Sequence, residues 1–137
     1  MEFSMRDAYL GPLSKESFRA HAVRALLDWC EDEGYTPYIA VSVDDSCVVP
    51  REYVNPDNTI VLCVSTLATR DFELDKDGMR FKTRFGDAVC AIDVPLCRIE
   101  AVFPKENTDL VSYFPVTTAP EPKKTKPEND IPVFTKL

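Results

Sequence analysis

The chain has 137 residues, which is enough for one domain of about 100 residues with additional segments at its ends. Its net charge is −7, from 16 basic and 23 acidic residues. Residues 1–103 hold 18 of the acidic and 11 of the basic side chains, so the acidity belongs to the predicted folded part. This balance argues against a protein whose affinity comes mainly from the phosphate backbone of nucleic acid.

The five cysteines are accompanied by a single histidine and form no Cys-x-x-Cys pair, which argues against a zinc site. Most of them fall in apolar runs, where a free cysteine behaves as a small hydrophobe. We therefore predict reduced thiols, no metal and no cofactor. No apolar run approaches the roughly 20 residues of a membrane span, and the first ten residues carry acids where a signal peptide would be basic and apolar. A soluble cytoplasmic protein is expected.

The N-terminal part predicts one helix after a flexible arm at residues 1–13. Ser14 fits a helix N-cap, and Gly34 fits the C-terminal stop. Apolar residues line one face, and Val23, Leu27 and Cys30 widen it beyond a single stripe. The surplus predicts a homodimer built on this helix, although a deeply buried helix explains the pattern equally well. His21 beside it has the pattern of a structural histidine. The predicted dimer face consists of Phe18, Ala22, Ala25, Leu26 and Trp29.

The middle of the chain predicts short strands separated by turns. Residues 38–43 alternate as a first strand, and residues 47–50 are predicted as a short strand or edge segment. Residues 59–65 are apolar on both sides, as in a central strand covered on both faces. Residues 72–74 form a further short strand before a polar turn that ends at Gly78.

The stretch from Met79 to Phe103 has the strongest strand pattern. Between residues 79 and 85, apolar side chains alternate with Arg80, Lys82 and Arg84, so one face seeks a core and the other is a basic stripe. Residues 90–94 and 99–103 repeat the alternation. The basic stripe is either an ordinary solvent face or a site for an acidic peptide or an RNA strand.

The C-terminal part changes in character after Pro104, because six of the 11 prolines lie in the last 34 residues. This composition predicts a flexible linker at residues 115–130. The end of the chain, however, has four large apolar side chains, which predicts a short docking motif on a tether. Packing of this end on the sheet as a terminal strand is the alternative. The predicted motif consists of Ile131, Pro132, Val133, Phe134, Thr135, Lys136 and Leu137.

Catalytic motifs are absent from the sequence. Four scattered glycines cannot form a glycine-rich phosphate loop, and no Gly-x-Ser-x-Gly or His-Glu-x-x-His spacing occurs. A pairing of His21 with a cysteine stays open as a thiol-enzyme alternative, but the apolar surroundings of the cysteines disfavour it. We therefore predict a protein that is not an enzyme.

Several motifs together resemble a known family. They are the Thr36-Pro37 break after the helix, Val49 to Tyr53, Ile60 to Leu62, Arg80 to Gly86 and Val94 to Leu96. In this order, from about Phe18 to Asn107, the chain is similar to SspB, the stringent starvation protein B family, whose members are adaptors that enhance the specificity of the ClpXP protease.

The resemblance implies a mainly β domain at residues 14–114, with an N-terminal helix and an Sm-like, partly open β-barrel that dimerises through the helix. It implies a groove that holds ssrA-type degradation tags and a disordered tail that docks on the N-terminal domain of the unfoldase ClpX. An Sm-like or OB-like RNA-binding protein is the alternative function. The groove residues expected from the resemblance are Tyr53, Val61, Phe81, Thr83, Arg84 and Phe85.

Overall fold

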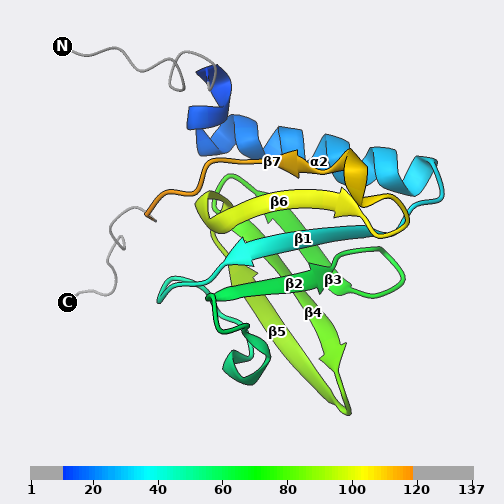
Figure 1. Cartoon of the computed structure of the whole chain (residues 1–137), viewed down its shortest axis with the longest axis vertical. Coiled ribbons are helices and arrows are strands. Elements are labelled where there is room, and N and C mark those ends of the chain that lie inside the picture. The colour runs from blue at the N-terminus through cyan, green and yellow to red at the C-terminus, as the bar shows by residue number, and fades with distance from the viewer. Residues whose placement is uncertain (1–10, 119–137) are drawn as a thin grey trace.

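The computed structural model describes residues 11–118, which form one α-helix, seven strands and four short 3-10 helices (Figure 1). The described chain is mainly β with an N-terminal helix, as predicted. Residues 1–10 and 119–137 lie outside this range. Most of the predicted arm and linker, and the predicted docking motif at 131–137, are therefore outside the described residues.

The helix α2, Glu16–Asp32, starts later than the sequence predicts. Its N-cap is Lys15, whose side chain makes no capping hydrogen bond. Ser14 belongs instead to a preceding 3-10 helix, η1 (Gly11–Ser14), in which its hydroxyl donates to the carbonyl of Gly11 over 2.9 Å. The prediction of Ser14 as the N-cap is wrong, because the hydroxyl that would cap the helix is used within this turn. Leu13 of η1 also packs against the core, so this end of the predicted arm is structured.

The end of α2 is as predicted, because Gly34 terminates it. Its φ of 77° is a left-handed conformation that glycine adopts without steric cost. The amide of Gly34 donates to the carbonyl of Glu31, and the amide of Tyr35 donates to the carbonyl of Cys30. These two bonds form a Schellman motif, which satisfies carbonyls that the helix itself cannot pair.

Four strands form the first sheet, in the order β2-β1-β6-β7. Their bounds are Pro37–Ser42 for β1, Thr59–Cys63 for β2, Ile99–Pro104 for β6 and Ser112–Tyr113 for β7. The central strand β1 pairs antiparallel with both β2 and β6, which places Ile39 opposite Leu62 and Val102. All three side chains are buried, so this face of the sheet lines the core. The sequence did not predict β7, since two residues carry no detectable period.

Three strands form the second sheet, in the order β3-β4-β5, so the barrel is only partly closed. They span Arg70–Asp75, Gly78–Phe85 and Ala88–Val94. On β4, Met79 and Phe81 are buried opposite Val94 and Ile92 of β5. The tight β3–β4 turn requires Gly78, because a Cβ there would lie 2.6 Å from the carbonyl oxygen of Val94.

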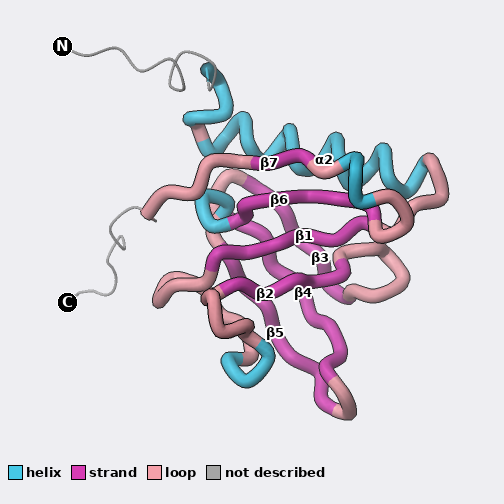
Figure 2. The backbone as a smooth tube through the Cα atoms, viewed as in Figure 1, coloured by secondary structure: helices cyan, strands magenta, loops and turns pink. Residues whose placement is uncertain are grey.

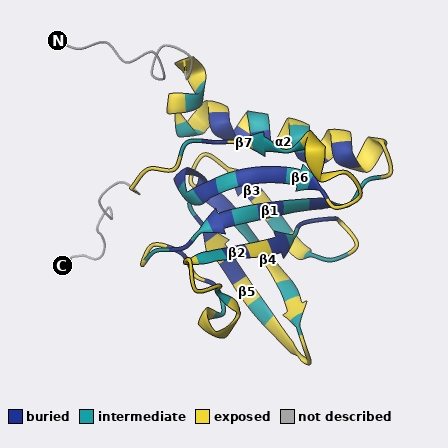
Figure 3. Cartoon of the chain, viewed as in Figure 1, coloured by how far each residue is buried: buried dark blue, intermediate teal, exposed yellow. Residues whose placement is uncertain are grey.

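The core lies between the two sheets and under α2, which contacts β1, β3 and β6 (Figure 3). The helix buries Ala20, Val23, Leu27 and Cys30, a spacing of three to four residues that matches one helical face. The predicted dimer face lies beside this buried face, and its Ala22 and Leu26 are partly buried against the core. Its two aromatic side chains, Phe18 and Trp29, are 44% and 40% exposed. The wide apolar surface of the helix therefore splits into a buried face and an exposed one.

The remaining connections are short turns and 3-10 helices (Figure 2). The 3-10 helices span Arg51–Tyr53 (η2), Leu96–Arg98 (η3) and Thr108–Leu110 (η4). The strand predicted at residues 47–50 is reduced to an isolated bridge, in which Val48 pairs with Asp93. Pro50 supplies no amide for a ladder, and η2 begins directly after it, which explains why this segment does not extend.

Two arginines hold the C-terminal end of the described chain against the domain. Arg98 donates to the carbonyl of Thr117 over 3.0 Å, and the amide of Thr117 donates to the carbonyl of Cys97. Phe114 is buried, and the guanidinium carbon of Arg19 lies 6.0 Å from the centre of its ring. Ordered contacts therefore continue to Thr117, three residues beyond the predicted end of the domain.

Candidate functional site

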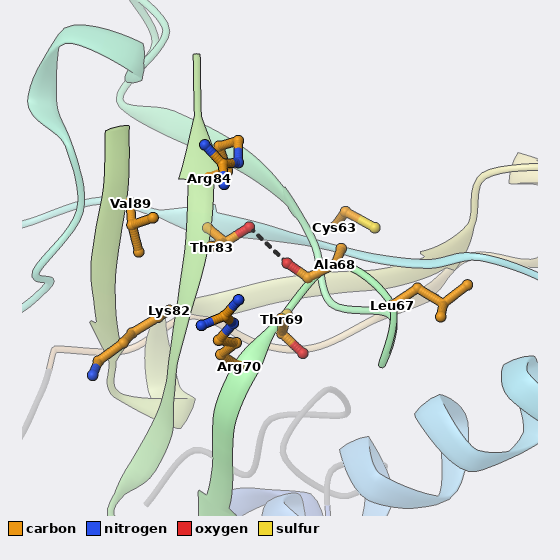
Figure 4. A pocket seen from close by; sticks show the side chains of 9 residues that line it. All are labelled: Cys63, Leu67, Ala68, Thr69, Arg70, Lys82, Thr83, Arg84 and Val89. Atoms are coloured by element: carbon orange, nitrogen blue, oxygen red, sulfur yellow. Dashed lines mark hydrogen bonds between the residues drawn. The ribbon is translucent and has the colours of Figure 1, made fainter. Parts of the chain in front are cut away.

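A hollow of about 660 Å³ lies at the connection between the first sheet and the second. The chain leaves β2 at Cys63, makes a turn at residues 65–69 and enters β3, while β4 and β5 form the opposite wall (Figure 4). We call this hollow the groove. Its lining residues are Cys63, Leu67, Ala68, Thr69, Arg70, Lys82, Thr83, Arg84 and Val89.

Three cationic side chains line the groove, but they differ in their partners. The ammonium of Lys82 lies 3.4 Å from a carboxylate oxygen of Asp71. Among the described residues, Arg70 and Arg84 make no ion pair, and both are exposed. These two arginines are therefore free to bind an anionic group of a ligand.

The third member of the predicted basic stripe, Arg80, lies outside the groove and is neutralised. It pairs with Asp75 at 2.7 Å and with Glu73 at 3.1 Å. Its hydrogen bonds to Asp75 and then to Glu73 raise the pKa of Arg80, and the bond from Arg80 is the first cause that lowers the pKa of Asp75. The stripe is therefore not one continuous basic surface, and only its Arg84 end is unpaired within residues 11–118.

Strand pairing leaves part of β4 open beside the groove. β5 pairs with β4 from Met79 to Phe85, whereas β3 pairs with β4 only as far as Lys82. Beyond this point, the hydroxyl of Thr83 donates to the carbonyl of Ala68 in the turn, over 3.0 Å. An exposed strand edge next to free cations is a suitable surface for an extended peptide, which can add to a sheet as a further strand.

The structure distributes the predicted groove residues over three environments. Thr83 and Arg84 line the groove. Tyr53 and Phe85 lie outside its lining and pack on one another with ring centres 4.7 Å apart, and Val61 is half exposed on β2. Phe81 is only 3% exposed and stacks on Phe72 in the core. Phe81 therefore faces the core together with Met79, because alternate residues of β4 point to the same side.

Most of the other lining residues belong to the segment from Cys63 to Arg70, which was not predicted as part of the groove. Cys63 lies in the strand predicted at residues 59–65, and the residues after it have no strand period. Lys82 was predicted only as a member of the basic stripe. Val89 on β5 was also missed, although the alternation on the β4–β5 hairpin places it opposite Arg84. That register was the one signal that could have identified it.

A second hollow, of about 460 Å³, lies between the exposed face of α2 and the segment around η4. Leu26 and Trp29 of the predicted dimer face line it together with Leu110 and Val111. Trp29 and Leu110 are each about 40% exposed. The exposed helix face is therefore continuous with apolar side chains of the segment between β6 and β7.

The five cysteines are free thiols, and Cys30, Cys47 and Cys97 are buried. Burial is the first cause that raises the pKa of each of these three thiols, which favours the protonated thiol over the nucleophilic thiolate. His21 lies exposed on α2. None of the helices in residues 11–118 has the length and apolar character needed to cross a membrane.

Together these features define a class of small, mainly β domain in which one helix covers part of the core and a basic groove runs beside an open strand edge. The chain matches the family described as Stringent starvation protein B over residues 17–133. It belongs to the SspB family, which confirms the resemblance inferred from its motifs.

A curated relative is the stringent starvation protein B homolog of Haemophilus influenzae (strain ATCC 51907 / DSM 11121 / KW20 / Rd). It is 36% identical over 98 residues, a match that covers 71% of this chain and 65% of the relative. The chain therefore matches slightly less than two thirds of that protein.

Proposed function

We propose that this protein is a non-enzymatic adaptor of the cytoplasm that binds ssrA-type degradation tags and tethers the tagged substrate to ClpX, enhancing degradation by ClpXP. The observation that carries the proposal is the groove, where Arg70 and Arg84 have no ion-pair partner among residues 11–118 and lie beside the open edge of β4. Membership of the SspB family supports the adaptor role.

Peptide binding in the groove would combine two kinds of contact. The backbone of an extended tag would pair with the open edge of β4 beyond Lys82. Its acidic side chains would then meet Arg84 and Arg70, and hydrogen bonds to charged groups contribute about 1.5–3 kcal/mol each. Tyr53, Val61 and Phe85 are proposed to extend this surface beyond the groove itself.

The tether is proposed to begin after Thr117, which still contacts the domain. Residues 118–130, the remainder of the linker predicted at 115–130, would be the flexible spacer, and Ile131 to Leu137 would dock on the N-terminal domain of ClpX. A flexible chain of this length has a typical span of roughly 20 Å. Such a short tether holds the tag near the unfoldase at an effective concentration of order mM, so neither contact alone needs high affinity.

Dimerisation is proposed to use the exposed face of α2. Phe18 and Trp29 would be covered by the same face of a second copy, together with Leu110 of the adjoining hollow. A twofold interface of this kind is self-complementary and would give each adaptor two tags and two tails.

The proposal is tested by separating tag binding from delivery. Removing residues 131–137 should leave the affinity for a fluorescent ssrA-type peptide and the dimer mass unchanged, while ClpXP degradation of a tagged substrate falls to the rate without adaptor. Replacing Val133 and Phe134 by Asp should have the same effect, and lengthening the 123–129 spacer with Gly and Ser should cost little. Parallel loss of peptide affinity and thermal stability on truncation would instead mean that the tail packs on the barrel.

A further inference from the structure

The turn at residues 65–69 is held rigidly, although it has no regular secondary structure. The amide of Ala68 and the hydroxyl of Thr69 both donate to the carbonyl of Ser65, at 3.0 and 3.1 Å. From β4, the hydroxyl of Thr83 holds the carbonyl of Ala68. The backbone of this turn is therefore fixed both from within and from the opposite wall of the groove.

The helix supplies one more contact to this turn. A carboxylate oxygen of Glu31, in the last turn of α2, accepts a hydrogen bond from the amide of Thr66 over 3.0 Å. These residues are 35 positions apart in the chain. A charge-assisted bond to a backbone amide is stronger and more directional than one between neutral groups. Glu31 thus ties the first half of the turn to the end of the helix through a solvent-exposed hydrogen bond.

Leu67 occupies the middle of this fixed turn and is 98% exposed, the highest value among the exposed large apolar side chains of the described residues. It lines the groove at the end away from Val89, and Figure 4 shows its side chain pointing outward from the turn, away from Thr83 and Arg84. A flexible loop could fold such a side chain onto the domain, but this turn is held in place on both sides of Leu67. The side chain is therefore presented at one end of the groove with almost no contact of its own.

We infer that Leu67 is a specificity-determining contact of the groove and that Glu31 is the residue that positions it. The inference rests on the proposed function and adds to it the chemistry of the ligand. The preferred peptide carries an apolar side chain near its acidic residues, so that the acids meet Arg84 and Arg70 while the apolar group packs on Leu67. Because Leu67 buries almost nothing in the free protein, its full contact with a ligand is gained only on binding.

The direct test is Leu67→Ala, with binding to a fluorescent ssrA-type peptide measured by anisotropy. Affinity should fall about five- to twentyfold, as expected for a large aliphatic side chain that becomes buried in the complex. The melting temperature should not change, since the side chain is not packed in the free protein. Val48→Ala is the matched control, because Val48 is 56% exposed but does not line the groove.

A double-mutant cycle identifies the partner of Leu67. Each apolar residue of the peptide is replaced by Ala in turn, and one of these peptides should bind the wild-type and Leu67→Ala proteins equally well. Unchanged affinity of Leu67→Ala for the parent peptide overturns the inference and leaves the proposed function standing. If the wild-type protein does not bind the peptide, the proposed function fails and the inference fails with it.

The positioning role of Glu31 has its own measurement. Glu31→Ala should speed hydrogen exchange of the Thr66 amide about tenfold and weaken peptide binding about threefold, whereas Glu31→Gln, which keeps an acceptor oxygen, should retain most of both. Asp28→Asn is the control, because Asp28 is an exposed acid on the same helix. A merely stabilising role would lower the melting temperature without a selective effect at Thr66, and that outcome would remove Glu31 from the inference.

Discussion

The two ends of the barrel use arginine in opposite ways. Beside the C-terminal end of the described chain, the Arg98 side chain is 13% exposed and donates to the carbonyl of Ser42, the hydroxyl of Ser42 and the carbonyl of Thr117. In the groove, Arg84 is exposed and has no ion pair among residues 11–118. An arginine side chain therefore stabilises the fold when its donors bind acceptors within the domain, as in Arg98. It is available to a ligand when they do not, as in Arg84.

Arg19 is a second structural cation, although its buried Nε has no hydrogen-bond partner among the described residues. It is 3% exposed and has no carboxylate partner among the described residues, but it donates to the carbonyls of Leu96 and Leu13. Burial is the first cause that lowers the pKa of Arg19. This guanidinium, on α2, therefore links the neighbouring η1 to η3, which is distant in sequence. Burial and partners, and not residue type, therefore separate structural cations from binding cations in this molecule.

The largest effect expected from this comparison is on stability. Arg98→Ala removes three hydrogen bonds and the pairing with Asp44, and it leaves the part-buried carbonyl and hydroxyl of Ser42 without this donor. The free energy of unfolding should fall by about 3 kcal/mol, because a broken, partly buried charged network costs several kcal/mol. Arg98→Lys should recover only part of this loss, since one ammonium cannot reproduce the planar fork.

Urea denaturation of both Arg98 variants measures the effect. Peptide affinity, measured under conditions where the variants remain folded, is the internal control and should be unchanged. A loss of stability below about 0.5 kcal/mol, the range of ordinary surface substitutions, would show that Arg98 is not structural and would break the comparison.

The second expected effect is on binding. Arg84→Ala should weaken the affinity for an acidic ssrA-type peptide roughly tenfold or more, because one charge-assisted contact is lost. Stability should stay within about 0.5 kcal/mol of the wild type, since Arg84 has no ion-pair partner among the described residues. The salt dependence of binding should also become shallower. Unchanged affinity in a folded Arg84→Ala protein would remove Arg84 from the site.

The sequence predicted the elements whose patterns are local. The alternation from Met79 to Phe85 predicted β4 and its buried face, and Gly34 predicted the end of α2. These signals work because strand and helix periods act within a few residues. The same alternation places Phe81 on the core face of β4. Phe81 is indeed buried there, and it does not line the groove.

The sequence could not predict the features that depend on distant contacts. The turn at residues 65–69 takes its shape from Glu31 on the helix and Thr83 on β4, and neither leaves a pattern within the turn. The two-residue strand β7 is defined only by its pairing with β6. Ser14 shows that a local prediction can also fail. Its hydroxyl could have capped α2, but it donates instead to the carbonyl of Gly11 within η1. The groove is therefore formed by tertiary contacts between residues that are distant in sequence, and the local sequence pattern does not identify its lining residues.

The smallest expected effect concerns Arg80, which lies between the two cases. Arg80 is unlike Arg98 because its partners, Glu73 and Asp75, are themselves more than half exposed, and it is unlike Arg84 because both its contacts are already made. Exposed ion pairs contribute little to stability and are screened by salt. Arg80→Gln should therefore lower peptide affinity less than Arg84→Ala does, and it should lower the melting temperature less than Arg98→Ala does.

The measurable consequence of Arg80→Gln is a rise in the pKa of Asp75. The hydrogen bond from Arg80 is the first cause that lowers the pKa of Asp75, followed by the bond from the amide of Asp77. A lowered pKa in the folded state means that this carboxylate stabilises the fold above the ordinary aspartate pKa of about 3.9, and that the contribution is lost as the pH falls through the lowered value. In Arg80→Gln, the pKa of Asp75 should rise toward its ordinary value while the bond from Asp77 keeps it somewhat lowered. Titration of the Asp75 carboxyl by NMR checks this, and an unchanged pKa would mean that the Arg80 pair does not persist in solution.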